Sequence, residues 1–236
     1  AHKIDSTLRG NWAEELVART WAVPVLLVPA LPSLGRTCDG GEVLEHGRPV
    51  HEGAAGSDVR RPVWTSRPGE MLTAAGAGSV RSLRDVDAVR EWLGDAAGIA
   101  VADAHDEGEI ERIVAAWADG PPDVVLAGTS VVVGSAATVV SPSTAAASEP
   151  GPMVRPIEGP ILVVCGSVHP AARRQVGFAE HRGVPVASIA DDITARELQR
   201  HGALVLVTEI PVGDVSEPMA IAAATSLARG ATDLVA

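Results

Sequence analysis

The stretch Val23-Pro24-Val25-Leu26-Leu27-Val28-Pro29-Ala30 decides the fold, because it is apolar throughout and shows no alternation of polar and apolar residues. Such a run is typical of a strand that is buried on both faces, as strands of parallel sheets are. Two later runs, residues 98–104 and 123–128, have the same character, and the first of them carries an acid, Asp103, near its end. We therefore predict three buried strands in one sheet.

Helical patterns surround these runs. Residues 11–19, 82–93 and 106–118 place apolar side chains at helical spacing, and Ser6 or Thr7 could cap the first of the three helices. The alternation of strands and helices predicts βαβ units and a three-layer α/β arrangement. Residues 31–70 are dense in Gly, Pro, Arg and His, which predicts a functional loop or a set of short hairpins.

A second α/β unit follows a change in composition. Residues 141–160 are rich in Pro, Ser, Gly and Ala and read as a linker. Beyond it we expect strands at 161–165, 185–189 and 203–208, and helices at 170–182, 193–201 and 218–229. The prediction is therefore two three-layer α/β units with mainly parallel sheets, over residues 1–145 and 157–236, joined by a Pro/Ser/Gly-rich linker.

Composition restricts the class of partner. The chain has 236 residues, a net charge of −11 and 46% hydrophobic residues, so it can bury a core but lacks the basic character that nonspecific binding to nucleic acid or anionic membranes needs. No signal peptide pattern is seen, and the longest uncharged stretch, residues 124–140, is short and rich in turn formers. Cys38 and Cys165 show no metal spacing. We expect a reduced, cytoplasmic protein that binds neither nucleic acid nor membranes.

One polar stretch stands out as a candidate site: Lys3-Ile4-Asp5-Ser6-Thr7-Leu8-Arg9-Gly10-Asn11. It gathers two cations, a carboxylate, two hydroxyls and an amide around one glycine. Lys3 is the single lysine of the chain, whose other cations are all arginine, so this position favours a compact ammonium group. The same residues also suit a polar turn that caps a helix.

A second candidate follows the strand expected at 161–165. Gly166 would let a ligand approach the backbone, and Ser167 could either cap the next helix or bind a phosphate at its N-terminus. Other signatures are absent from the sequence: there is no phosphate-binding G-x-x-x-x-G-K-[ST], no dinucleotide G-x-G-x-x-G, no H-E-x-x-H and no G-x-S-x-G. An NAD-dependent oxidoreductase would therefore lack its fingerprint.

Three of these segments together resemble the four-carbon acid sugar kinases. The nine residues from Lys3 to Asn11 resemble the family signature. Pro29-Ala30-Leu31-Pro32-Ser33-Leu34-Gly35-Arg36-Thr37 with Asp39-Gly40, and Cys165-Gly166-Ser167-Val168-His169-Pro170 with Gln175, resemble two further family elements in the expected order. The resemblance implies an N-terminal domain that binds a tetronate-type sugar acid, a C-terminal domain that binds ATP, and transfer of phosphate to the terminal hydroxyl.

The resemblance also implies roles for particular residues. Lys3 and Arg9 would face the substrate carboxylate or the transferred phosphate, and Arg36 would be a further anion contact. Hydroxyl groups would be read by Asp5, Ser6 and Thr7, and also by Asn11 unless it belongs to the helix. Gly166 and Ser167 would contact the nucleotide phosphates. Mg²⁺ is implied by the chemistry, and the general base is not identified.

Two other motifs of the family do not occur in the chain: an Asp-Asp-x-Thr-Gly substrate loop and a Gly-Gly-Asp-Thr nucleotide motif. We therefore expect an internal portion of such a kinase, lacking both ends. The alternative is a non-catalytic sugar-acid binding or regulatory protein that retains the pocket. The expected partners are a sugar acid of the threonate, erythronate or 3-oxo-tetronate type and ATP, with a homodimer as a further option.

Overall fold

The computed structural model describes residues 1–20, 22–58, 61–140, 158–167, 169–191, 195–208 and 217–235. The chain divides into two compact units, unit 1 at residues 1–151 and unit 2 at residues 152–236. Each unit has its own sheet and its own apolar core, so each is described by itself.

Unit 1 is built on a five-stranded sheet in which all strands are parallel. Its order is β1-β8-β2-β7-β6. The strands are β1 (His2–Lys3), β2 (Val25–Val28), β6 (Val80–Leu83), β7 (Ile99–Ala102) and β8 (Val125–Gly128). Strand β2 lies in the centre and all four of its side chains are fully buried. The apolar run at residues 23–30 thus contains a buried strand of a parallel sheet, as predicted, and this strand is the central one.

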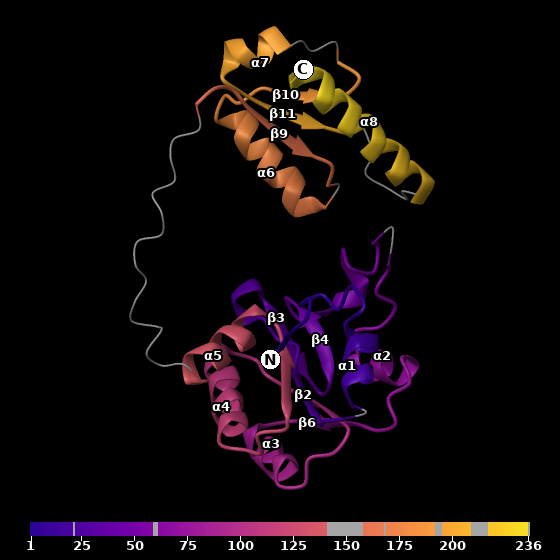
Figure 1. Ribbon diagram of the computed structural model, residues 1–236, viewed down its shortest axis with the longest axis vertical. Coiled ribbons are helices and arrows are strands. Elements are labelled where there is room, and N and C mark those ends of the chain that lie inside the picture. Colours follow the sequence, from indigo (N-terminus) through magenta and orange to yellow (C-terminus); the bar gives the residue numbers. More distant parts are fainter. Residues whose placement is uncertain are drawn as a thin grey trace. The chain divides into compact units, whose positions relative to one another are not determined.

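The described residues of unit 1 also form five helices, which complete its three layers. They are α1 (Trp12–Thr20), α2 (Pro68–Ala74), α3 (Val86–Leu93), α4 (Glu107–Ala118) and α5 (Ser130–Val140). Helices α3, α4 and α5 cover one face of the sheet, and α1 and α2 cover the other (Figure 1). The carboxylates of Asp85 and Asp106 accept hydrogen bonds from the amides of Ala88 and Glu109 and cap α3 and α4. The α/β fold class is confirmed.

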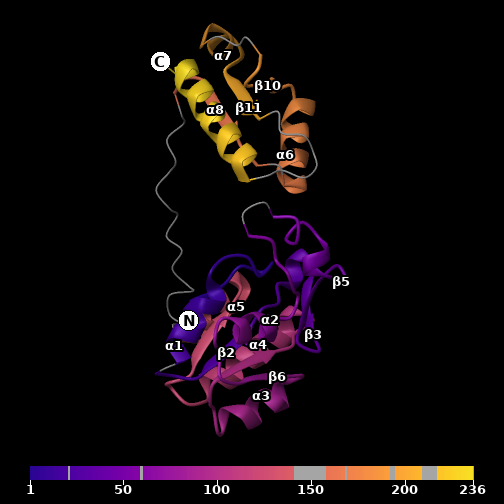
Figure 2. The ribbon, with the colours of Figure 1, turned by 90° about the vertical axis from the view of Figure 1, so that its right-hand side faces the viewer.

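The expected helices of unit 1 need correction. The helix expected from residue 82 begins at Val86, because Ser82 and Leu83 pair with β7 and Asp85 is the cap. Helices α2 and α5 were not expected. The segment at 31–70 does contain short hairpins, in an antiparallel sheet (Figure 2). Its strands are β3 (Arg36–Asp39), β4 (Glu42–Glu45) and β5 (Arg48–Pro49), flanked by the 3-10 turns η1 (Pro32–Leu34) and η2 (Val50–Glu52).

Unit 2 has a smaller parallel sheet of three described strands, in the order β10-β11-β9. The strands are β9 (Ile161–Cys165), β10 (Val186–Ser188) and β11 (Ala203–Val207), and the helices are α6 (Pro170–His181), α7 (Ala195–His201) and α8 (Glu217–Val235). Leucines from β11, α7 and α8 form most of its core. Most of the expected linker, residues 141–157, lies outside the described residues.

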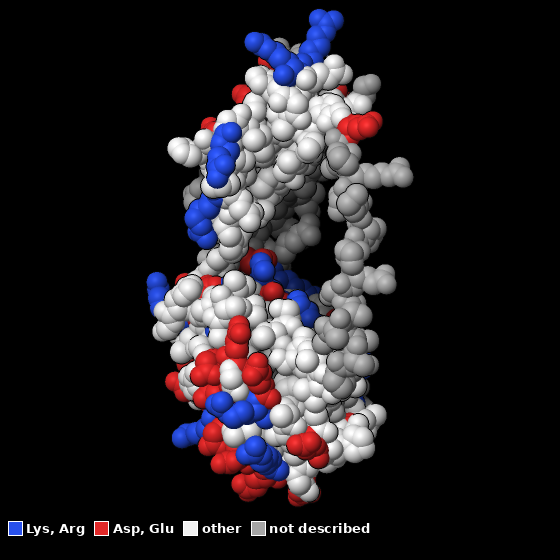
Figure 3. Space-filling view, turned by 90° about the vertical axis from the view of Figure 1, so that its left-hand side faces the viewer, with Lys and Arg blue, Asp and Glu red and all other residues white. Residues whose placement is uncertain are grey.

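The surface of unit 1 carries charges of both signs. Over α3 and α4, acidic and basic side chains are interleaved (Figure 3), and Arg90 forms an ion pair with Asp87 at 2.8 Å. This face therefore offers no continuous basic surface to a polyanion. Among the described helices, none combines the length and the apolar composition that crossing a membrane would require.

Alanine substitutions at two glycines test how tightly β8 packs. A Cβ atom on Gly128, the last residue of β8, would lie 2.7 Å from both Val132 Cγ1 and the carbonyl oxygen of Val28. We expect Gly128→Ala to lower the free energy of unfolding by about 1–3 kcal/mol, the usual cost of overpacking. Gly134→Ala, at an open position of α5, should instead raise it by about 0.5–1 kcal/mol. Urea denaturation measures both, and equal effects of the two substitutions would contradict the packing described.

Candidate functional site

The carboxyl edge of the unit 1 sheet brings distant segments of the chain together. Strands β1, β2, β7 and β8 all end there, and the segments that follow them start at residues 4, 29, 103 and 129. The buried hydroxyl of Thr129 donates a 2.6 Å hydrogen bond to the carbonyl of Ala30 and ties two of these segments together. Ligands of parallel α/β sheets bind at this edge, so the candidate site is sought here.

Residues 5–11, the N-terminal loop, are fixed by the apolar residues within and beside them. The amide of Ile4 donates to the carbonyl of Gly128 at 2.8 Å, and the indole of Trp12 donates to the carbonyl of Leu8 at 2.9 Å. Ile4 and Leu8 are both buried. Leu8 has a φ of 63°, in the left-handed region that costs a residue other than glycine about 1–3 kcal/mol. Burial thus holds the loop in a strained shape and leaves its polar side chains at the sheet edge.

The polar side chains of the N-terminal loop form a network. The carboxylate of Asp5 accepts hydrogen bonds from the hydroxyl of Thr7 and, at 3.3 Å, from both the amide and the Nε of Arg9. Arg9 Nε also donates to Thr7 Oγ1 at 3.0 Å, and its Nη1 lies 3.5 Å from Asp58. Burial raises the pKa of Asp5, but the hydrogen bond from Thr7 and the charge of Arg9 outweigh it, so the net pKa lies below its ordinary value. Asp5 is therefore an anion at neutral pH.

Arg36 joins this loop from 30 residues away. Its Nη1 donates to Ser6 Oγ at 2.9 Å, while its Nε and Nη2 donate to Glu45 Oε1 at 2.9 and 2.5 Å. Only 16% of the Arg36 side chain is exposed. The structure thus brings together two of the segments that the sequence marks as functional, and it does so through a side-chain contact.

Lys3 and Asn11 lie at the two ends of the stretch. Lys3 is exposed at the end of β1, and its ammonium group has no hydrogen bond or ion pair with any residue that the structure describes. Asn11 directly precedes α1, and its side-chain oxygen accepts a hydrogen bond from Arg61. Sequence reasoning missed Arg61, because no pattern in residues 31–70 relates it to Asn11.

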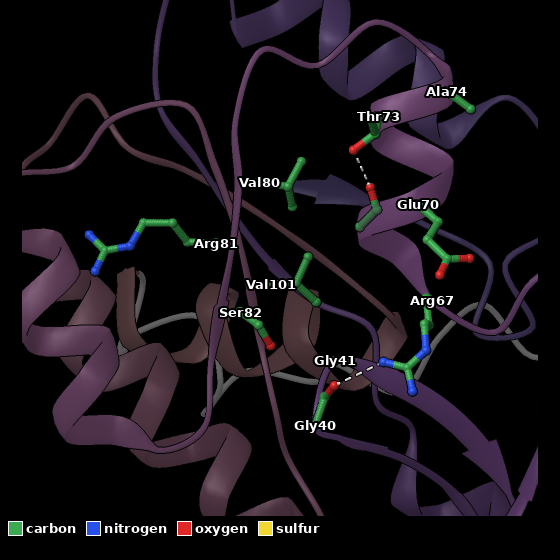
Figure 4. A pocket seen from close by; sticks show the side chains of 11 residues that line it. Gly40, Gly41, Arg67, Glu70, Thr73, Ala74, Val80, Arg81, Ser82 and Val101 are labelled. Carbon is green, nitrogen blue, oxygen red and sulfur yellow. Dashed lines mark hydrogen bonds between the residues drawn. The ribbon is translucent and has the colours of Figure 1, made fainter.

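Two cavities among the described residues of unit 1 bear on the site. A cavity of about 390 Å³ adjoins the N-terminal loop and is lined by residues that include Arg9, Arg61 and Trp64. A second, of about 570 Å³, lies between α2, the Gly40-Gly41 turn and strands β6 and β7. In this second cavity Arg67 reaches the carbonyl of Gly40 and also pairs with Glu42, whereas Arg81 points away (Figure 4). Arg67 is thus paired with a glutamate, as Arg36 is, but the lining of this cavity includes neither Arg36 nor any residue of the N-terminal loop.

In unit 2, Gly166 and Ser167 follow β9 and are exposed. Of the two roles considered for Ser167, capping of the next helix is not the one that the structure shows. Helix α6 is capped by His169, whose Nδ1 accepts from the amide of Ala171 at 3.1 Å, and Ser167 Oγ accepts from the amide of His169 at 3.2 Å. The hydroxyl hydrogen of Ser167 is not used by that bond, so it can still donate to a ligand. The phosphate contact itself stays a prediction.

Comparison with known proteins gives the family. Residues 1–140 match the family model described as "Sugar-binding N-terminal domain". A D-threonate kinase of Cupriavidus necator is 32% identical over 195 residues, which cover 76% of this chain. The chain belongs to the four-carbon acid sugar kinase family. A second member, the D-threonate kinase of Bordetella bronchiseptica, is 31% identical over 80% of this chain. The chain spans about half the length of these relatives, 45% and 46% respectively.

Solved structures of the family share the fold. A protein of Bordetella bronchiseptica, described as a domain of unknown function with bound citrate and as a domain-swapped dimer, is 28% identical. The match covers 99% of this chain and 58% of that one, with a TM-score of 0.51. A Haemophilus influenzae protein matches 98% of this chain and 63% of its own with a TM-score of 0.57. At 17% identity the second likeness supports the fold alone.

The two cysteines should differ in reactivity. Burial raises the pKa of the Cys38 thiol well above its ordinary value, and the neighbouring charge of Asp103 raises it further. Cys165 is only half-buried. Because the thiolate is the reactive form, we expect iodoacetamide to label Cys165 in the native protein and both cysteines after denaturation. Mass spectrometry of tryptic peptides measures this, with Cys165→Ser as the control that abolishes native labelling. Native labelling of Cys38 at the rate of Cys165 would contradict the burial described.

The Asp5 network should respond to acid. A carboxyl group whose pKa is lower in the folded than in the unfolded protein stabilises the fold above the unfolded pKa, and the contribution is lost as the pH falls through the folded pKa. We therefore expect the stability difference between wild type and Asp5→Asn to be present at pH 7 and to vanish in strong acid. Urea titrations across pH measure this, with Asp87→Asn, an exposed acid of α3, as control. A difference that grows on acidification would overturn the assignment.

Proposed function

We propose that this protein phosphorylates the terminal hydroxyl of a four-carbon sugar acid of the threonate type, with ATP as donor. The hydrogen bond between Arg36 and Ser6 carries the proposal, because it joins two family motifs at the edge of a parallel sheet where ligands bind. The curated relatives that are about 30% identical are named D-threonate kinases, which supports the substrate class.

The residues at this edge match the chemistry of a sugar acid. Such a molecule has one carboxylate and a row of hydroxyl groups. Arg36 offers a guanidinium that is already oriented, and Lys3 offers an ammonium with no partner among the described residues. The anionic Asp5 can accept hydrogen bonds from the hydroxyl groups of the ligand, and the hydroxyl of Ser6 can accept from them or donate to them. Citrate, bound in the Bordetella structure, is likewise a hydroxy acid and supports this ligand class.

The nucleotide belongs to unit 2 in this proposal. Gly166 and Ser167 lie open at the carboxyl end of β9, just before the 12-residue helix α6, whose N-terminus favours anions. ATP would supply the phosphoryl group, and Mg²⁺ would be held largely by its phosphates. The described residues include no group of three or more His, Cys, Asp and Glu side chains able to hold a metal by themselves. Unit 1 is then the sugar-acid domain and unit 2 the nucleotide domain.

The cellular setting follows from the same proposal. Both cysteines are free thiols, which fits a reducing compartment with abundant ATP such as the cytoplasm. A homodimer is proposed on the likeness to the Bordetella protein described as a domain-swapped dimer. The relatives are about twice as long as this chain, and the complete kinase activity is proposed for the whole protein.

Substitution of the two cations tests the substrate site. We expect Lys3→Met and Arg36→Lys each to weaken binding of D-threonate by about 10- to 100-fold, because each removes a charged hydrogen bond and Lys cannot reproduce the planar fork of Arg. Isothermal titration calorimetry measures this affinity. Arg48→Ala, an exposed cation of β5, is the control and should bind as wild type does.

A second titration with ATP separates the two functions considered. ATP binding together with threonate binding supports the kinase. Threonate binding without ATP binding would favour a non-catalytic sugar-acid-binding protein. If neither Lys3→Met nor Arg36→Lys altered the affinity for threonate, the N-terminal loop would not be the substrate site.

A further inference from the structure

We propose that Asp103 is a positioning residue: it fastens the β3–β4 hairpin to the end of β7 and so holds Arg36 at Ser6. Asp103 directly follows β7, and its amide donates to the carbonyl of Leu83 at 2.8 Å, which fixes its backbone in the sheet. The inference rests on the proposed function, since it assigns a role toward the same substrate site.

The carboxylate of Asp103 is fully engaged. Its Oδ2 accepts a hydrogen bond from the amide of Gly40 at 2.8 Å. Its Oδ1 accepts from the amide of Gly41 at 2.9 Å and from the thiol of Cys38 at 3.3 Å. Only 4% of Asp103 is exposed. A buried carboxylate without such donors would be strongly unfavourable, so these three donors are what allow it to remain there, and they keep it from touching a substrate.

The turn that Asp103 grips has a special backbone. Asp39 pairs with Glu42, so Gly40 and Gly41 form a two-residue hairpin loop, and both have positive φ, 57° and 73°. This conformation is the one that two-residue hairpins favour and that glycine adopts without strain. It leaves two adjacent amides that point outward from the hairpin, and two adjacent amides suit one carboxylate. Two of the three hydrogen bonds to Asp103 therefore come from the backbone of this turn, and the third comes from the Cys38 thiol.

The hairpin transmits this position to Arg36. Cys38 and Arg36 are two residues apart on β3, so their side chains lie on the same face of the strand. Cys38 points to Asp103, and its backbone exchanges two hydrogen bonds with Ala104, at 2.9 and 3.0 Å. Arg36 on the same face then meets Ser6, and its partner Glu45 is directly opposite it on β4. A shift of β3 by one residue would turn Arg36 to the other face.

Asp103→Asn tests this role with little change in volume. One of the two amides would then face the NH₂ group of Asn in place of an acceptor. We expect the affinity for D-threonate to fall about tenfold, with the affinity for ATP unchanged because ATP is assigned to unit 2. Asp39→Asn is the matched control: it also removes one carboxylate beside the Gly40-Gly41 turn, but the Asp39 side chain is exposed, and among the described residues its carboxylate pairs with His105 alone, at 3.5 Å.

A double-mutant cycle shows whether Asp103 acts through Arg36. On an Arg36→Ala background, Asp103→Asn should weaken threonate binding less than about twofold. Equal losses on both backgrounds, or unchanged affinity in Asp103→Asn with an intact fold, would overturn the inference. A uniform loss of threonate and ATP affinity would also overturn it, because that pattern indicates general unfolding.

A readout without ligand keeps this inference separate from the proposed function. In ¹H–¹⁵N NMR spectra, the Nε–H signal of Arg36 should be sharp and slow to exchange in wild type and in Asp39→Asn. It should broaden or vanish in Asp103→Asn, and the amides of Gly40 and Gly41 should exchange faster. If wild type binds no threonate while these signals change as expected, the proposed function fails and the positioning role of Asp103 stands. Unchanged signals in Asp103→Asn would refute that role.

Discussion

Parallel pairing of the strands is the constraint on which the rest of unit 1 depends. Because β1, β8, β2 and β7 run in one direction, their carboxyl ends meet at a single edge. The edge is held by contacts between residues that are remote in sequence, such as Thr129 with Ala30 and Arg36 with Ser6. If these strands did not share one direction, the N-terminal loop, the β3–β4 hairpin and Asp103 would not lie near one another. The direction of the strands therefore determines which segments meet at the candidate site, and the side chains on those segments determine its chemistry.

Much of this architecture could be predicted from local patterns. The apolar runs without alternation mark β2, β7 and β8 within a few residues, because a strand covered on both faces must be apolar along its whole length. An apolar run also marks β9, although three of its five side chains are exposed. Helix α4 is found from its periodicity. Strand β1 has two residues and α2 has seven, so neither offers a period long enough to recognise, and both were missed. Helix α5 has eleven residues and was also missed, because its apolar and small residues show no amphipathic period.

The candidate site shows a sharper limit of sequence reasoning. Lys3, Asp5, Ser6, Thr7, Arg9 and Asn11 could be chosen because they crowd one short stretch, and Arg36 because of a family motif. Arg61 and Asp103 could not, since each acts on residues 50 or more positions away, Asn11 in one case and the Gly40-Gly41 turn in the other. The Gly-Gly pair was the available signal: a two-residue hairpin turn exposes amides that need an acceptor. Which acid would supply it depends on the sheet order, which the pattern of residues does not contain.

The way Arg36 is held bears on what the site can select. Its guanidinium is gripped by Glu45 and Ser6 before any ligand arrives, so few rotamers are lost when a ligand binds. The same grip weakens its net charge, because Glu45 already faces it at 2.5 Å. A guanidinium held in this way selects a ligand by the direction of its remaining N–H groups more than by the strength of its charge. In the proposed substrate site, small acids that differ only in the stereochemistry of a hydroxyl group would be distinguished by whether they fit this stationary donor.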